Sequence, residues 1–150
     1  MCRNMKNFYD QQGINTNINF VLEFEPITNN GEPTIEIILN NEKIYGKYPL
    51  TSFRRIYTRL KLMDSIKLEI LMSDKEYDAE KETAIIIKTL KIDGIEIIPQ
   101  YNHLIDYQND HNINTKTNYL GYNGKWTLDI DRPFYQWYHQ ISGQGWLLTP

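Results

Sequence analysis

Acidic side chains recur at every second position of one short segment. The members are Asp74, Glu76, Asp78, Glu80 and Glu82. Calcium prefers several oxygen ligands held close together, and alternating carboxylates on a loop can supply them. Asp93, which precedes Gly94 in a turn sequence, would add a carboxylate if that turn lies beside the acidic segment. The candidate ligands of a calcium ion are therefore Asp74, Asp78, Glu82 and Asp93.

The same segment has a simpler interpretation, which leaves metal binding open. It lacks the glycine of an EF-hand loop, and Lys75 and Lys81 offset part of its negative charge. A solvated loop with internal ion pairs is the commoner structure for such a sequence. Asp93-Gly94 is likewise typical of a tight hairpin turn, which needs no metal ion.

The C-terminal segment 119–150 is rich in aromatic residues and contains all three tryptophans of the chain. Aromatic rings with a polar atom can stack on sugar rings, and they are frequent anchors of protein interfaces. The candidate residues for binding a partner chain or a glycan are Trp126, Tyr135, Trp137, Tyr138 and Trp146. The alternative is that Trp126, Phe134 and Trp137 close one end of the fold. Residues 146–148 are too apolar to remain in water, so we expect them to dock on their own domain or on a neighbour.

No group of residues indicates catalysis. Cys2 has no base near it in the sequence, and no serine lies in a nucleophile-elbow context. His103, His111 and His139 match no zinc-binding spacing, so we interpret them as surface residues. Carboxylates are plentiful, but nothing singles out the opposed pair that a glycosidase needs. We therefore predict that the chain is not an enzyme.

Length and charge limit the classes of protein to consider. The chain has 150 residues, a hydrophobic fraction of 41% and a net charge of −3, which suits one domain with its own core. So small a charge gives no support to a nucleic-acid partner. Residues 1–16 predict a flexible polar arm, and residues 17–150 a single domain. The sequence shows neither a signal peptide nor a stretch long enough to span a membrane, so we expect a soluble protein without membrane insertion.

Much of the chain alternates apolar and polar residues with period two, which is typical of β-strands. The predicted strands cover residues 17–25, 34–40, 42–45, 53–63, 65–72, 83–91, 95–97 and 125–130. Turns or loops are expected at 26–33, 46–52 and 73–82, with hairpin turns at Asn40-Asn41 and Asp93-Gly94. The polar stretch 99–122 predicts a long functional loop.

After the last strand the sequence changes to a helical signal. Asp131-Arg132-Pro133 predicts the start of a short helix with Asp131 as its cap, and Gly143 predicts its end. Short strands at regular spacing, followed by one helix, predict an all-β fold: an antiparallel β-sandwich or jelly roll with a short C-terminal helix.

The middle of the chain has a characteristic order of strand and turn motifs within residues 33–99. They are residues 34–37, the turn at 40–41, and residues 67–72, 73–75, 82–85 and 92–95. In this order they resemble calcium-dependent carbohydrate-binding modules of the xylan-binding type. The resemblance implies a jelly-roll sandwich whose acidic loop residues hold a calcium ion, which in turn chelates sugar hydroxyls. Residues 118–150 instead resemble C-terminal segments of tailed-phage proteins, in which such sandwiches serve as virion parts.

Two functions follow as expectations. The first is a non-catalytic structural or adhesion component of a phage virion, made in the host cytoplasm, whose partners are other virion chains or copies of itself. The alternative is a calcium-dependent glycan-binding module. The two differ in where Trp137, Tyr138 and Trp146 lie: between chains in the first case, and in an open groove beside residues 74–82 in the second.

Overall fold

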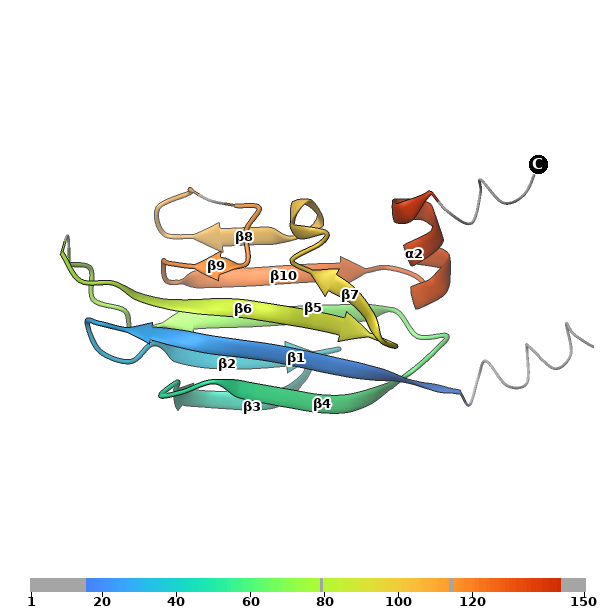
Figure 1. Ribbon diagram of the computed structural model, residues 1–150, viewed down its shortest axis with the longest axis horizontal. Coiled ribbons are helices and arrows are strands. Elements are labelled where there is room, and N and C mark those ends of the chain that lie inside the picture. Colours follow the sequence, from blue (N-terminus) through green and yellow to red (C-terminus); the bar gives the residue numbers. More distant parts are fainter. Residues whose placement is uncertain (1–15, 79, 114, 144–150) are drawn as a thin grey trace, which may run out of the picture.

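The described residues, 16–78, 80–113 and 115–143, form two antiparallel sheets in the computed structural model (Figure 1). The first sheet has the order β4 (Arg54–Lys61), β1 (Asn17–Thr28), β6 (Thr83–Ile92) and β7 (Ile95–Ile98), with β9 (Tyr119–Leu120) also paired to β6. The second has the order β3 (Glu42–Pro49), β2 (Thr34–Leu39), β5 (Ile66–Ser73), β10 (Gly124–Ile130) and β8 (Asp106–Asn109). These strands confirm the predicted all-β sandwich.

Period-two alternation builds the core between the two sheets. On β1, Ile18, Phe20, Leu22 and Phe24 are buried, while the residues between them are more exposed. Alternate residues of β2, β5 and β10 join them in one hydrophobic cluster. Each fully buried large apolar side chain of this kind stabilises the fold by about 1.5–3 kcal/mol, so the alternation fixes which face of each strand turns inward.

Both predicted hairpin turns are confirmed. Asn40 and Asn41 have φ angles of 51° and 67°, and Asp93 and Gly94 have φ angles of 51° and 80°. Two successive residues with positive φ are the requirement of the type I′ turn, whose twist matches that of the strands it joins. Asn, Asp and Gly adopt this conformation more readily than other residues, which explains their presence here.

Three segments are more regular than the sequence predicts. The strand β1 continues to Thr28 and β3 continues to Pro49, so the turns expected at 26–33 and 46–52 are shorter. The stretch 99–122 is not one long loop, because it contains the 3-10 helix η1 (Asn102–Leu104), β8 and β9. The period-two signal is weak there because β8 is short and polar, and its two buried residues are Tyr107 and Asn109.

The predicted helix is present as α2 (Phe134–Ser142), but its cap differs from the expectation. Pro133 is the N-cap residue, and no side chain caps the helix. Asp131 lies too early to reach the first turn and instead binds Arg132, with 2.8 Å between Oδ1 and Nε. Gly143 ends the helix as predicted, with a φ of 72°. No helix among the described residues is long and apolar enough to span a membrane.

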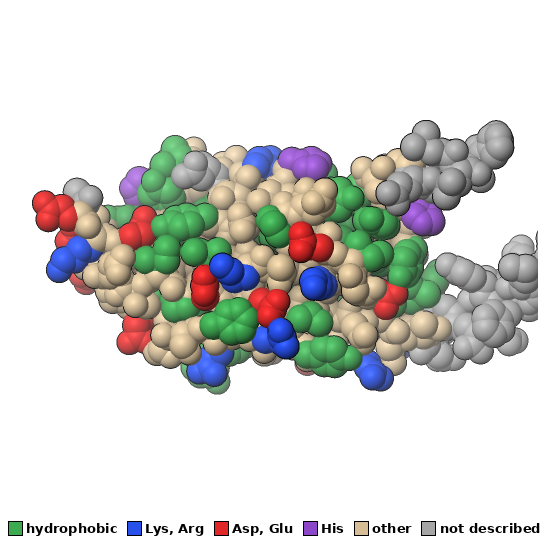
Figure 2. Space-filling view, in the orientation of Figure 1, with side chains coloured by type: hydrophobic (Ala, Val, Ile, Leu, Met, Phe, Trp, Pro, Cys, Tyr) green, Lys and Arg blue, Asp and Glu red, His purple; other side chains and the backbone are tan. Residues whose placement is uncertain are grey.

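Charges of both signs are interspersed on the face that Figure 2 shows. Arg55 pairs with Glu23 at 2.8 Å, and Lys88 pairs with Glu25 at 3.2 Å. The basic residues of segment 53–63 lie on β4, which is an edge strand of its sheet. Charged side chains on an edge strand discourage pairing with other sheets, so this segment has a structural explanation.

Candidate functional site

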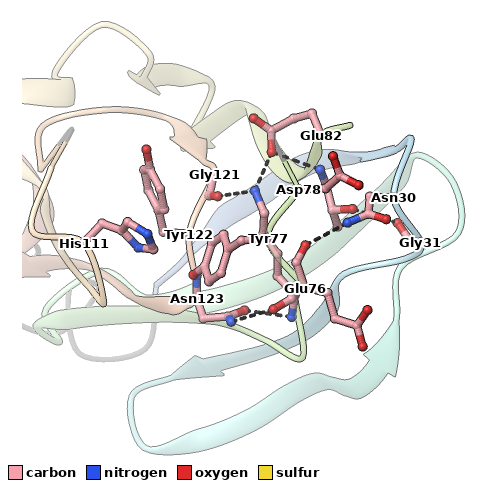
Figure 3. Close-up of polar contacts among 12 residues, drawn as sticks. Asn30, Gly31, Glu76, Tyr77, Asp78, Glu82, His111, Gly121, Tyr122 and Asn123 are labelled. Carbon is pink, nitrogen blue, oxygen red and sulfur yellow. Dashed lines mark hydrogen bonds and ion pairs between the residues drawn. The ribbon is translucent and has the colours of Figure 1, made fainter. Parts of the chain in front are cut away.

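A pocket of about 220 Å³ opens at the end of the sandwich where β5 gives way to the acidic loop. We call it the Tyr77 pocket. Its wall combines the loop that joins β5 to β6 with the short segment between β9 and β10 (Figure 3). The lining residues are Lys75, Tyr77, Asp78, Glu82, Tyr119, Gly121 and Tyr122. Residues more than forty positions apart in the sequence therefore meet at this site.

Side-chain amides hold the acidic loop in place. The backbone N–H of Lys75 donates to Asn123 Oδ1 at 3.0 Å, and Asn123 Nδ2 donates to the backbone oxygen of Lys75 at 3.1 Å. This pair of bonds imitates the pairing of two strands and continues the contact of β5 with β10. Asn30 Nδ2 donates to the backbone oxygen of Glu76 at 2.9 Å from the opposite side. The loop is thus tied to the segment between β9 and β10 and to the turn between β1 and β2.

The charged side chain of Lys75 lies in the pocket wall and is only 5% exposed. Its ammonium group donates hydrogen bonds to a carboxylate oxygen of Glu82 and to the backbone oxygen of Gly121. The same nitrogen lies 5.3 Å from the ring centroid of Tyr77 and 5.7 Å from that of Tyr122. These distances are within the range of cation–π attraction.

Glu82 stays ionised although it is partly buried. Desolvation by itself would raise the pKa of its carboxyl group, but the hydrogen bond and the positive charge of Lys75 outweigh it. Further hydrogen bonds from the Thr83 backbone N–H and from Tyr119 act in the same direction, so the pKa of Glu82 falls below its usual range. Desolvation and the neighbouring Glu82 carboxylate in turn raise the pKa of Tyr119 to about 12.

Tyr77 is anchored by its hydroxyl group, and the residue as a whole stays 45% exposed. The hydroxyl donates to the Asp110 carboxylate at 2.6 Å and accepts from the Asn123 backbone N–H at 2.9 Å. Burial of the hydroxyl and its bond to Asp110 raise the pKa of Tyr77 to about 12. Asp110 itself is partly desolvated, but its bonds to Tyr77 and His111 lower its pKa.

Three rings form a continuous aromatic group beside the loop. His111 stacks on Tyr122 with centroids 4.4 Å apart, and the centroids of Tyr77 and His111 are 4.6 Å apart. Figure 3 shows these rings on the side of the pocket opposite to Glu82. Two of these rings, those of Tyr77 and Tyr122, line the pocket together with the carboxylates of Asp78 and Glu82. The pocket therefore combines aromatic surface with hydrogen-bond acceptors.

The structure brings two of the four predicted calcium ligands to this pocket. Asp78 and Glu82 line it, whereas Asp74 lies in the same loop, exposed and outside the lining. Asp93 does not join them, because it follows the last residue of β6 and Glu82 precedes the first. Ten strand residues separate the two positions by about 30 Å, and Asp93 accepts a hydrogen bond from Tyr135 instead.

Among the residues that the structure describes, the oxygen donors around the pocket are not grouped as calcium ligands would be. Within residues 16–78, 80–113 and 115–143, no three His, Cys, Asp or Glu side chains are grouped so that they could hold a metal ion. The Glu82 oxygen that faces the pocket wall binds the ammonium group of Lys75 and the N–H of Thr83. Asp78 Oδ1 accepts from the backbone N–H of Glu80 at 2.8 Å. The arrangement of donors therefore does not match a calcium site.

The aromatic residues predicted to bind a partner or a glycan lie elsewhere. Trp126 is completely buried, and its Nε1 donates to the Thr117 backbone oxygen at 2.8 Å. Trp137 is 7% exposed and packs within the core cluster. Both residues lie in the core, as the alternative expects, because alternation on β10 and helical spacing on α2 turn both inward.

Tyr135 and Tyr138 lie on α2 and pack partly against the core. The Tyr138 ring stacks on Phe134 with centroids 5.9 Å apart. Neither tyrosine lines the Tyr77 pocket. Trp146 and the apolar residues 146–148 lie outside the described residues, as do residues 1–15 of the predicted arm.

Sequence reasoning missed the aromatic part of the site. Tyr77 stands inside the acidic loop, and Tyr119 and Tyr122 stand in the aromatic segment, so each was within a segment already singled out. Their meeting depends on the pairing of β9 with β6 and of β10 with β5, which no local pattern reveals. His111 follows Asp110 directly, but its stacking on Tyr122 has no signal in the sequence.

No protein-family model and no curated protein matches this chain. Among solved structures, a selenomethionine form of the calcium-dependent carbohydrate-binding module vCBM60 matches with a TM-score of 0.49 and 9% identity, over 75% of this chain and 92% of that one. The complex of vCBM60 with galactobiose matches with a TM-score of 0.48 and 11% identity, over 74% and 97% of the two chains. Scores at this level do not assign the chain to a family.

Proposed function

We propose that this chain binds a glycan in the Tyr77 pocket without transforming it. One observation carries the proposal: Tyr77, which is 45% exposed, lines a pocket that also contains the carboxylate groups of Asp78 and Glu82. Sugar rings present C–H groups on their faces and hydroxyl groups around their edges. The C–H groups pack on aromatic faces, and the hydroxyl groups donate hydrogen bonds to carboxylates. Hydrogen bonds to a charged carboxylate are stronger than hydrogen bonds to a neutral acceptor.

The size of the pocket supports a small ligand. A volume of about 220 Å³ is below the roughly 300–1,000 Å³ typical of pockets for drug-sized molecules. We expect the pocket to take one ring of an oligosaccharide, with the rest of the glycan outside it. The acidic rim also favours a neutral glycan over an anionic one, because Asp78 and Glu82 would repel a carboxylated or sulfated sugar.

The pKa shifts support binding rather than catalysis. A general acid in a glycosidase needs a carboxyl group whose pKa is raised towards neutrality. The pKa values of Glu82 and Asp110 are shifted downward instead. Both groups are therefore suited to accept hydrogen bonds at neutral pH and not to donate a proton.

Calorimetry against a panel of neutral oligosaccharides, including xylohexaose and galactobiose, tests the proposal. We expect binding by the wild type and a loss of at least roughly tenfold in affinity for Tyr77→Ala and Tyr122→Ala, since truncation of a central aromatic contact costs more than 1 kcal/mol. The matched control is Tyr48→Ala, which removes a tyrosine that is 57% exposed on β3. Absence of heat with every glycan, or equal losses in the control, would refute the proposal.

The virion role predicted from the sequence stays a prediction, as do its location and its protein partners. Exposed tyrosines on two edge strands allow its expected self-association to be tested. Tyr48 and Tyr57 are both more than half exposed, and they lie on β3 and β4, each of which is one edge strand of its sheet. Light scattering of the wild type and of a Tyr48→Ser, Tyr57→Ser double variant would show whether these edges join copies of the chain.

A further inference from the structure

The positive charge of Lys75 is held in an unusual setting. Its side chain is 5% exposed, whereas Asp74, Glu76, Asp78, Glu80 and Lys81 of the same loop are all exposed. A buried ammonium group is costly unless it is paired and hydrogen-bonded. Here it is both, because the Glu82 carboxylate and the Gly121 carbonyl accept from it.

The surroundings of this nitrogen are those that a protein offers to a bound cation. A carboxylate oxygen and a backbone carbonyl oxygen approach it directly, and the ring faces of Tyr77 and Tyr122 lie 5.3 and 5.7 Å away. The contacts also join separate parts of the chain, since Gly121 and Tyr122 lie more than forty positions beyond Lys75. The ammonium group is therefore at the centre of the pocket wall.

We propose that the Lys75 ammonium group is a built-in cation that holds the Tyr77 pocket together in place of a metal ion, so that the pocket needs no divalent cation to form. This differs from the calcium dependence that the sequence resemblance implies. A metal ion at this point would have to displace an ammonium group that is attached to the chain and already satisfied. Lys75 is thus a positioning residue for Glu82, Tyr77 and Tyr122.

The neighbouring carboxylates strengthen this inference because they are engaged as well. Glu82 accepts from the Thr83 N–H at 2.9 Å in addition to Lys75. Asp78 accepts from the Glu80 N–H, and Asp110 accepts from Tyr77 and lies 2.8 Å from His111. One carboxylate oxygen of Glu82 and one of Asp78 are thus taken up by protein donors, which reduces the number of oxygen ligands that the pocket could offer to a metal ion.

Thermal unfolding of the full chain tests this inference without any glycan, so its outcome is separate from that of the proposed function. We expect the melting temperature of the wild type to be the same in millimolar calcium chloride and in EDTA. Lys75→Met keeps the length of the side chain but removes its charge and its donors, and should lower the melting temperature by roughly 4–8 °C. The control Lys81→Met, on the exposed neighbouring lysine, should leave it unchanged.

Rescue distinguishes a cation site from a merely structural side chain. Lys75→Ala removes the ammonium group together with its stem, so n-propylammonium chloride should raise the melting temperature of this variant more than sodium chloride does. The same amine should have no effect on Lys75→Met, whose side chain fills the space. A wild type stabilised by calcium, a Lys75→Met protein as stable as the wild type, or a Lys75→Ala protein indifferent to the amine would overturn the inference. The calcium comparison needs the wild type alone and stands even if a variant fails to fold.

Discussion

Asn123 provides the most direct test of how the loop of the Tyr77 pocket is held. Its side chain makes two hydrogen bonds to the backbone of Lys75, at 3.0 and 3.1 Å, and both are partly buried. Asn123→Ala removes both bonds. Because each such bond contributes about 0.5–1.5 kcal/mol net, we expect a loss of about 2 kcal/mol in the free energy of unfolding. For a chain of this length that loss lowers the melting temperature by about 4–8 °C.

Urea unfolding followed by tryptophan fluorescence measures this loss. Asn123→Asp is the sharper variant, since it preserves the shape and the acceptor for the Lys75 N–H but turns an oxygen toward the Lys75 carbonyl oxygen. We expect it to be at least as destabilised as Asn123→Ala at neutral pH. Gln136→Ala, on the exposed surface of α2, is the matched control and should shift the free energy by less than about 0.5 kcal/mol. An Asn123→Asp protein with the urea midpoint of the wild type would refute the reasoning, because the pairing would then not depend on the amide.

Three further predictions concern charge, core and backbone. The pKa of Glu82 in the folded protein lies below its usual value of 4.5. The ionised carboxylate therefore stabilises the fold above about pH 4.5, and this stabilisation is lost as the pH falls through the lowered pKa. Urea midpoints measured against pH should fall less steeply in acid for Glu82→Gln than for the wild type. Trp126→Ala should cost about 3–5 kcal/mol in equilibrium unfolding, since the residue is fully buried, and a cost below 1 kcal/mol would contradict its assignment to the core. Gly124→Ala should weaken the pairing of β8 with β10, because an added Cβ would lie 2.3 Å from the Gln108 backbone oxygen. The weaker pairing should appear as faster hydrogen exchange of the β8 amides, and unchanged exchange would contradict the prediction.

The strands were predictable because their signal is local. Residues such as Ile18, Phe20 and Leu22 alternate with polar neighbours, and one buried face is enough to produce that pattern. The two hairpin turns were predictable for the same reason, because positive φ selects Asn, Asp and Gly at adjacent positions. The strand β8 was missed because Tyr107 is its one large apolar residue, and a single residue sets no period.

The site was only half predictable, because its parts meet through long-range pairing. The acidic loop is visible in the sequence, but the ammonium group that pairs with Glu82 belongs to Lys75. In the sequence Lys75 only reduces the net negative charge of the loop, and nothing there indicates that it binds Glu82. The prediction that Asp93 joins the site requires its turn to lie beside the acidic loop. The ten residues of β6 place this turn and the loop at opposite ends of the sandwich, and only the register of the strands reveals it.

The aromatic residues show why composition does not locate a binding surface. The same residue types occur at both ends of the sandwich, and what they contact decides their role. On α2 the Tyr138 ring stacks on Phe134, and Trp137 is 7% exposed, so apolar contacts use most of the ring surface there. At the other end the Tyr77 hydroxyl group bonds to Asp110 and Asn123, its ring packs beside His111, and the residue as a whole stays 45% exposed. A residue anchored at its polar tip can keep its orientation while part of its surface stays exposed, and for that reason we propose the Tyr77 pocket, rather than the α2 end, as the binding site.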